Sequence, residues 1–177
     1  MRWLNIPNGL CVFRLALTPF IVLRILAIDF RGALWLLAIA GVTDALDGFL
    51  ARKFNWTTRV GLVLDPIADK VLLGSTYLAL GAADALPWWL VILVFGRDLL
   101  LLAGTALLML ITDRRNFPPS IWGKLSTALQ ILTGIWALIT WVPDLLLGLT
   151  GFATAWSGIH YIVTVGRAAS RHSSGDR

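Results

Sequence analysis

Long apolar runs fill almost the whole of this sequence, and they constrain its fold more than any other feature. The chain has 177 residues, of which 58% are hydrophobic and 14% are charged, whereas a soluble globular chain is about 25% charged. A membrane-spanning helix needs about 20 predominantly apolar residues. The runs predict six such helices, at residues 8–28, 32–53, 61–82, 88–112, 118–142 and 145–166. The sequence therefore predicts an all-α, polytopic membrane protein with six transmembrane helices.

The predicted helices leave no room for a soluble domain. Their connections are short, so we expect one membrane domain over residues 1–177. After Gly166 the sequence becomes polar, small and basic, which predicts a flexible tail over residues 167–177.

Basic residues are distributed unevenly between the two sets of predicted loops. With six spans, both termini share one side of the membrane with the loops after the second and fourth spans. Ten basic residues fall on that side, namely Arg2, Arg52, Lys53, Arg59, Arg114, Arg115, Lys124, Arg167, Arg171 and Arg177. The opposite loops carry only Arg31. Because cytoplasmic loops are enriched in Lys and Arg, we expect both termini in the cytoplasm.

The net charge of +5 follows the same asymmetry. Basic residues on a cytoplasmic membrane face attract anionic lipid headgroups. Nucleic-acid binding would need a domain that presents a basic surface to water, and no such domain is predicted. We therefore expect contact with membrane lipids and no binding of nucleic acid.

Four aspartates interrupt the second and third apolar runs. Asp44 and Asp47 are three residues apart and Asp65 and Asp69 are four apart, so each pair shares one helix face. Each carboxylate costs about 2.5–3.5 kcal/mol at the centre of a membrane helix. Four of them together cost roughly 10 kcal/mol, which is comparable to the stability of a whole domain. A compensating positive charge is therefore needed beside them.

The neighbours of these aspartates suggest what that charge is. Gly48, Ala51 and Gly61 are small and leave space beside the carboxylates. Oxygen ligands without a nearby His or Cys favour Mg²⁺ or Mn²⁺ over zinc. Arg52 lies one turn beyond Gly48 on the same helix, where its guanidinium suits a phosphate. The pattern predicts a divalent-metal and phosphate site just below the cytoplasmic surface.

Two other interpretations of the aspartates stay open. Pairing with Arg14, Arg24 or Lys70 would make some of them structural residues. Alternatively, intramembrane carboxylates also line cation channels and transporters. Transporter sites, however, tend to lie near the bilayer midplane between repeats, whereas this cluster lies near one face and no repeat is evident.

The segment from Asp44 to Asp69 reads D-x2-D-G-x2-A-R-x8-G-x3-D-x3-D. It resembles the signature of the CDP-alcohol phosphatidyltransferases and matches all eight fixed positions across 26 residues. The segment Asn5 to Asn8, followed by Arg14, is similar to the start of phosphatidylglycerophosphate synthases and CMP-forming cardiolipin synthases. Later segments, around Gly96 and around Trp122, also look like this branch.

The resemblance implies an activity and a set of roles. It implies transfer of a phosphatidyl group from CDP-diacylglycerol by a six-helix membrane enzyme that is usually a homodimer. Asp44, Asp47 and Asp65 would be metal ligands, and Asp69 would be the general base that also touches a second metal. The residues lining the CDP pocket would be Gly48, Ala51, Arg52 and Gly61.

The acceptor alcohol is less constrained. Glycerol 3-phosphate is the expected acceptor, with Arg97 and Lys124 as candidate ligands of its phosphate, beside the Arg114–Arg115 pair. Phosphatidylglycerol, the acceptor of a cardiolipin synthase, is the alternative, and Asp98 after Arg97 resembles that group. We expect the protein in a bacterial inner membrane with its active site facing the cytoplasm.

Overall fold

The computed structural model describes residues 6–54, 61–111 and 121–174. Side chains are described for residues 9–46, 49, 53, 67–104 and 121–164. These parts of the chain are helical and contain no strand. The helices are α1 (Ile6–Leu26), α2 (Phe30–Phe54), α3 (Gly61–Ala82), α4 (Trp88–Ile111), α5 (Ile121–Ile139) and α6 (Asp144–Ser174). The prediction of an all-α chain with six long helices is confirmed.

The observed helix ends differ little from the predicted ones, with one exception. Helix α6 continues past Gly166 to Ser174, through the segment for which a flexible tail is predicted. Ala168 and Ala169 have the highest helix propensity and no proline or glycine interrupts the chain before Ser174. The backbone is therefore helical as far as Ser174, and the flexibility of the segment stays a prediction.

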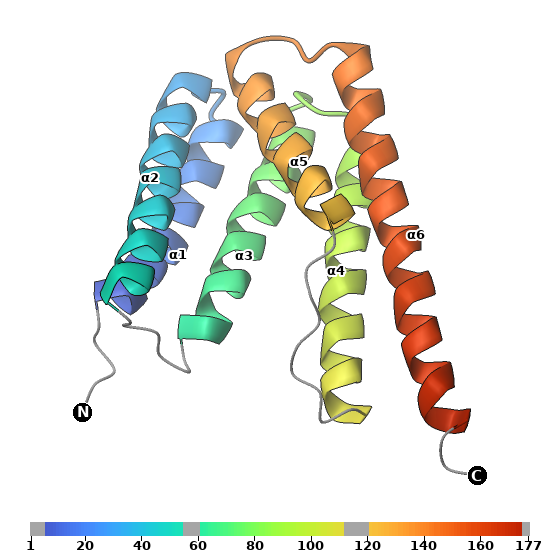
Figure 1. The fold of residues 1–177 in the computed structure, drawn as a ribbon. Helices are drawn as coiled ribbons and strands as arrows, with labels where there is room; N and C mark the ends of the chain where they lie inside the picture. The colour runs from blue at the N-terminus through green and yellow to red at the C-terminus, as the bar shows by residue number, and fades with distance from the viewer. Residues whose placement is uncertain (1–5, 55–60, 112–120, 175–177) are drawn as a thin grey trace. The chain divides into compact units, whose positions relative to one another are not determined.

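The described residues form two compact units. Unit 1 contains α1, α2, α3 and the segment Gly134–Trp141, and unit 2 contains α4, the first part of α5 and α6. In unit 1, α1 packs against both α2 and α3, and Figure 1 shows α2 running antiparallel to the other two. Its core includes Ile21, Ile25 and Tyr77, each at most 1% exposed.

In unit 2, α4 and α6 run side by side in the same direction (Figure 1). Arg97 contacts Ser157, and one turn later the Leu101 carbonyl accepts a hydrogen bond from the Tyr161 hydroxyl at 3.3 Å. Both contacts join residues 60 positions apart, as parallel helices require. A Cβ on Gly104 would lie 2.6 Å from the Tyr161 ring, so the glycine permits this close approach.

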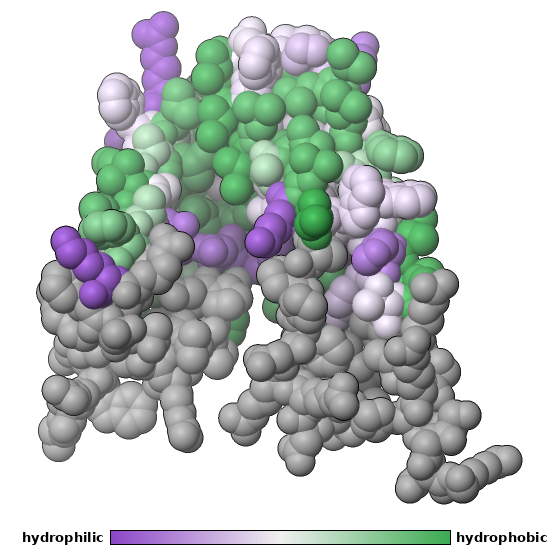
Figure 2. Space-filling model, viewed as in Figure 1, coloured by the Kyte–Doolittle hydropathy of each residue, from purple (hydrophilic) through white to green (hydrophobic). Residues whose placement is uncertain are grey.

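Two membrane-type features accompany these helices. Within the described residues, the segments Gly9–Leu26 and Asp144–Thr164 are long and apolar enough to cross a membrane. Large apolar side chains also lie exposed along the helices, including Trp35 at 73% and Ile92 at 67%. Figure 2 shows hydrophobic side chains over most of the coloured part of its visible face. Apolar solvent, rather than water, suits such a surface.

A tight turn joins α1 to α2. Ile28 adopts a positive φ of 61°, and the Asp29 amide donates to the Arg24 carbonyl at 2.9 Å, which closes α1 with a Schellman motif. Asp29 then caps α2, because its Oδ1 accepts a hydrogen bond from the Gly32 amide at 2.9 Å. Its Oδ2 lies 2.7 Å from Arg24 Nη1. The Gly32 amide, and secondarily the Arg24 guanidinium, lower the pKa of Asp29.

This cap predicts a pH-dependent contribution to stability. Because the pKa of Asp29 is lowered in the folded state, its contribution is complete above the unfolded value of about 3.9 and disappears as the pH falls through the lower folded value. We expect Asp29→Ala to lower the melting temperature of detergent-solubilised protein at pH 7, and the deficit to shrink below about pH 4. Asp29→Asn is the matched control, since it keeps an acceptor for Gly32 but cannot titrate. A deficit that is constant with pH would contradict the ionised cap.

Candidate functional site

The aspartate cluster lies on two helices of unit 1. Asp44 and Asp47 lie on α2, and Asp65 and Asp69 lie on α3. Both segments are helical as predicted, so each pair occupies one face of its helix. Of the four side chains, the structure describes those of Asp44 and Asp69.

Arg14 of α1 brings Asp44 and Asp69 together. Its Nη2 lies 2.6 Å from Asp44 Oδ1, and its Nη1 donates a hydrogen bond to Asp69 Oδ1. The Arg14 side chain is 1% exposed, whereas those of Asp44 and Asp69 are 50% and 53% exposed. One buried guanidinium therefore joins the first and last aspartates of the signature, which lie 25 residues apart on different helices.

This arrangement confirms part of the alternative in which basic residues pair with the aspartates. Arg14 does so, whereas Arg24 pairs with Asp29 in the turn at the other end of α1. Pairing with Arg14 does not enclose the carboxylates, because half of each side chain stays exposed. The cluster therefore combines one buried positive charge with two carboxylate side chains that are half exposed.

The remaining predicted site residues of unit 1 have helical backbones but lie outside the described side chains. They are Asp47, Gly48, Ala51 and Arg52 on α2, and Gly61 and Asp65 on α3. Within the described side chains, no group of three or more potential metal ligands is found. Asp44 and Asp69, whose side chains are half exposed, carry carboxylate oxygens, which are the ligands that Mg²⁺ and Mn²⁺ prefer. The chemistry of these two residues fits such an ion.

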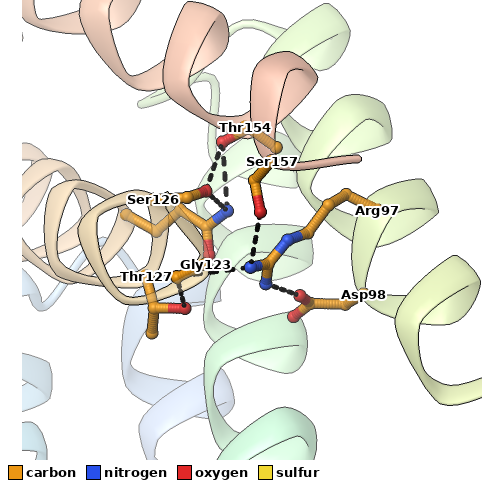
Figure 3. Close-up of polar contacts among 8 residues, drawn as sticks. Arg97, Asp98, Gly123, Ser126, Thr127, Thr154 and Ser157 are labelled. Atoms are coloured by element: carbon orange, nitrogen blue, oxygen red, sulfur yellow. Dashed lines mark hydrogen bonds and ion pairs between the residues drawn. The ribbon is translucent and has the colours of Figure 1, made fainter. Parts of the chain in front are cut away.

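Unit 2 carries a second polar cluster, which is built around Arg97 of α4 (Figure 3). Arg97 is 6% exposed and Asp98 is 7% exposed. Arg97 Nη1 lies 2.7 Å from Asp98 Oδ1, while Nη2 donates to Ser157 Oγ at 3.1 Å and to the Gly123 carbonyl at 3.3 Å. The guanidinium thus connects α4 to α5 and α6.

Polar side chains continue along the contact between α5 and α6. Gln130 Nε2 donates to Ser126 Oγ at 3.2 Å and to Thr154 Oγ1 at 3.1 Å, and the Thr133 and Thr150 hydroxyls lie 2.7 Å apart. All five side chains are fully buried. Hydrogen bonds between polar side chains hold membrane helices together where no hydrophobic driving force exists between them. This network therefore serves helix packing in unit 2.

The candidate acceptor ligands differ in their surroundings. Lys124 is exposed on α5, while Arg97 is buried and already bonded to three groups. Arg97 Nε is buried and has no hydrogen-bond partner among the described residues. Arg114 and Arg115 lie outside the described residues. A role in acceptor binding stays a prediction for Arg97 and Lys124.

Comparison with known proteins places the chain in a family. Residues 4–165 match the CDP-alcohol phosphatidyltransferases. The chain belongs to this family. The match includes α1 to α5 and most of α6, so both units, and not the signature segment alone, are part of the shared sequence.

Curated relatives carry two kinds of name. A Sodalis glossinidius CDP-diacylglycerol–glycerol-3-phosphate 3-phosphatidyltransferase is 34% identical over 96% of this chain and 96% of its own length. A probable phosphatidylglycerophosphate synthase of Mycobacterium tuberculosis is 36% identical over 77% of this chain and 68% of its own. A probable CMP-forming cardiolipin synthase of Drosophila melanogaster is 35% identical over 90% of this chain, which spans 57% of that relative's length.

The sequence allows Arg14 as a partner of the aspartates, but it does not predict that one guanidinium contacts both Asp44 and Asp69. The signature contains only residues of the second and third helices, and Arg14 lies 30 residues before Asp44. The available signal was a basic residue inside an apolar run, because an unpaired charge there is costly.

The buried and exposed cations of unit 2 predict different effects of mutation. Arg97→Gln removes the positive charge beside buried Asp98, so we expect a loss of about 3–5 kcal/mol and a clearly lower melting temperature in detergent. Lys124→Gln, the matched exposed change, should leave the melting temperature within error of the wild type. Equal melting temperatures for both variants would show that the Arg97 contacts do not stabilise unit 2.

Proposed function

We propose that this chain transfers the phosphatidyl group of CDP-diacylglycerol to glycerol 3-phosphate, producing phosphatidylglycerophosphate and CMP. The observation that carries the proposal is the meeting of Asp44 and Asp69 at Arg14. The first and last carboxylates of the family signature are thereby adjacent, with half of each side chain accessible to a substrate. The names of the Sodalis and Mycobacterium relatives support this acceptor.

Phosphatidylglycerol is the second candidate acceptor, which would make the enzyme a CMP-forming cardiolipin synthase. The Drosophila relative has that name, as does a Streptomyces coelicolor protein that is 33% identical over 94% of this chain. Asp98, which follows Arg97, also favours this branch. The two reactions share the donor and the leaving group and differ only in the hydroxyl that attacks.

A divalent cation, Mg²⁺ or Mn²⁺, belongs to this proposal. Asp44, Asp47, Asp65 and Asp69 would hold it, because they provide hard oxygen ligands from α2 and α3. When bound, such an ion neutralises negative charge on the diphosphate and on the departing CMP.

The chain's own residues would perform the remaining steps. Asp69, whose side chain is half exposed, accepts the proton of the acceptor hydroxyl as a general base. The hydroxyl oxygen forms a bond to the phosphorus attached to diacylglycerol, and the bond from this phosphorus to the oxygen of CMP breaks in line. Gly48, Ala51 and Gly61 leave space for the CDP group, and Arg52 pairs with its phosphates.

The proposal includes a membrane location, which the lengths of the helices and the distribution of basic residues support. Each of the six helices has between 19 and 31 residues, which is enough to cross a hydrocarbon core of about 30 Å. We propose six spans in a bacterial inner membrane, with both termini and the aspartate cluster on the cytoplasmic side, and a homodimer as the working assembly. The excess of basic residues on that side supports the orientation.

The acceptor is tested by measuring CMP release from CDP-diacylglycerol with Mg²⁺ or Mn²⁺, in parallel reactions with glycerol 3-phosphate and with phosphatidylglycerol. We expect release of CMP with glycerol 3-phosphate.

Asp44→Asn should reduce this CMP release to background, because it removes a ligand charge while keeping the side-chain size. Asp84→Asn is the matched control, since Asp84 is exposed with a φ of 54° that asparagine tolerates. Release with phosphatidylglycerol alone would assign the cardiolipin reaction, and full activity in EDTA would exclude the metal.

Orientation is tested by cysteine labelling in intact cells, after Cys11→Ser removes the only native cysteine. A cysteine at Thr57, between α2 and α3, should react with a membrane-impermeant maleimide only after the membrane is opened. A cysteine at Ala83, between α3 and α4, should react in intact cells. The reverse pattern would place the aspartate cluster on the outer side and exclude a cytoplasmic site.

A further inference from the structure

Arg14 is a buried charge in a position where charge is costly. It lies inside the apolar segment Gly9–Leu26, and its side chain is 1% exposed. A charged residue within a membrane span pairs with another group and marks a functional site far more often than it faces lipid. The Arg14 side chain meets two carboxylates that belong to the family signature, so its placement is tied to the site and not to general packing.

The geometry of the contact suits an arginine specifically. The two terminal nitrogens of one planar guanidinium each reach a different carboxylate, one on α2 and one on α3. A lysine ammonium is a point charge on a flexible chain and lacks this fork. The Thr18 hydroxyl donates to the Arg14 carbonyl at 3.0 Å, which places a further polar contact on the same turn of α1.

The contact with Arg14 leaves Asp44 and Asp69 partly exposed, so a metal ion or substrate could still reach them. Arg14 approaches from the buried side, and half of the Asp44 and Asp69 side chains stays exposed. A group that fixes the orientation of a metal ligand or general base from behind commonly affects affinity or rate by about 10- to 100-fold when it is removed. Arg14 contacts both carboxylates in this way, so it can fix the orientation of each.

We propose that Arg14 is a positioning residue of this site, which holds Asp44 and Asp69 at a set separation and balances their charge before the cation and the substrate bind. The proposal rests on the proposed function for its kinetic consequence. Its thermodynamic consequence rests on the ion pairs and on binding of a divalent ion by these carboxylates, because the ion and Arg14 would compensate the same negative charges. Removing Arg14 should therefore make the folded protein more dependent on a divalent ion.

Arg14→Met tests this, since methionine keeps a long side chain but removes the charge and the fork. The matched control is Arg24→Met, which lies on the same helix as Arg14 and breaks the exposed pair with Asp29 in the following turn. Melting temperatures of the purified full chain in detergent would be measured with EDTA and with Mn²⁺ alone. We expect Arg14→Met to melt well below the wild type in EDTA and to recover most of the loss in Mn²⁺. Arg24→Met should show the same small deficit in both.

A deficit in Arg14→Met that is equal with EDTA and with Mn²⁺ would overturn the proposal, because a residue that serves packing alone is not coupled to the ion. If Arg14→Met does not fold, Arg14→Lys is compared with the wild type in EDTA and in Mn²⁺ instead. We expect a smaller loss of melting temperature in EDTA and the same recovery in Mn²⁺.

The kinetic arm uses CMP release at saturating metal. We expect Arg14→Met to lower kcat about 10- to 100-fold with little change in KM for CDP-diacylglycerol, and Arg14→Lys to restore part of the rate. Unchanged kcat in a folded Arg14→Met protein would overturn the positioning role. A wild-type protein that is inactive with every acceptor would overturn the proposed function instead. The melting experiment would still decide the role of Arg14 where Mn²⁺ raises the melting temperature of the wild type, which shows that the ion is bound.

Discussion

The ion pairs between Arg14 and the carboxylates of Asp44 and Asp69 are the interaction on which the rest of unit 1 depends. Each partner would be costly alone in an apolar bundle, the arginine because it is fully buried and the aspartates because they lie within apolar helices. The guanidinium balances part of the negative charge of the two carboxylates, and the contacts tie α1 to both α2 and α3. The same contact that makes the three helices compatible with an apolar surrounding also assembles the candidate site.

Unit 2 also contains buried charged and polar groups, but they are compensated in a different way. Its interior holds a polar network in which the charged pair of Arg97 and Asp98 lies at one end and neutral hydroxyl and amide groups continue along α5 and α6. In an apolar solvent, hydrogen bonds and close backbone approach replace the hydrophobic driving force between helices. The two units thus use buried polar contacts differently, since unit 1 leaves its carboxylates accessible while unit 2 encloses its polar groups.

The family match and the geometry around Arg14 are two independent observations that agree. The match over residues 4–165 identifies the phosphatidyltransferase family, and the Arg14 contacts bring together the first and last carboxylates of the segment that resembles its signature. The acceptor is a separate matter, because relatives of similar identity bear either name. Glycerol 3-phosphate would need cations around its phosphate, whereas phosphatidylglycerol would need an apolar surface for its acyl chains. The two acceptors therefore differ in the residues that would bind them and not in their use of the aspartates.

The sequence by itself determined the six helices and the faces that the aspartates share, because apolar run length and helical spacing are local properties that the backbone obeys. It also identified the family, since eight residues at set intervals in one segment form a specific pattern. Only the tertiary structure decided that Arg14 joins Asp44 to Asp69, that Arg97 is enclosed by Asp98, Gly123 and Ser157, and that Lys124 is exposed. These outcomes depend on which helix faces meet, and local spacing says which residues share a face but not what lies opposite.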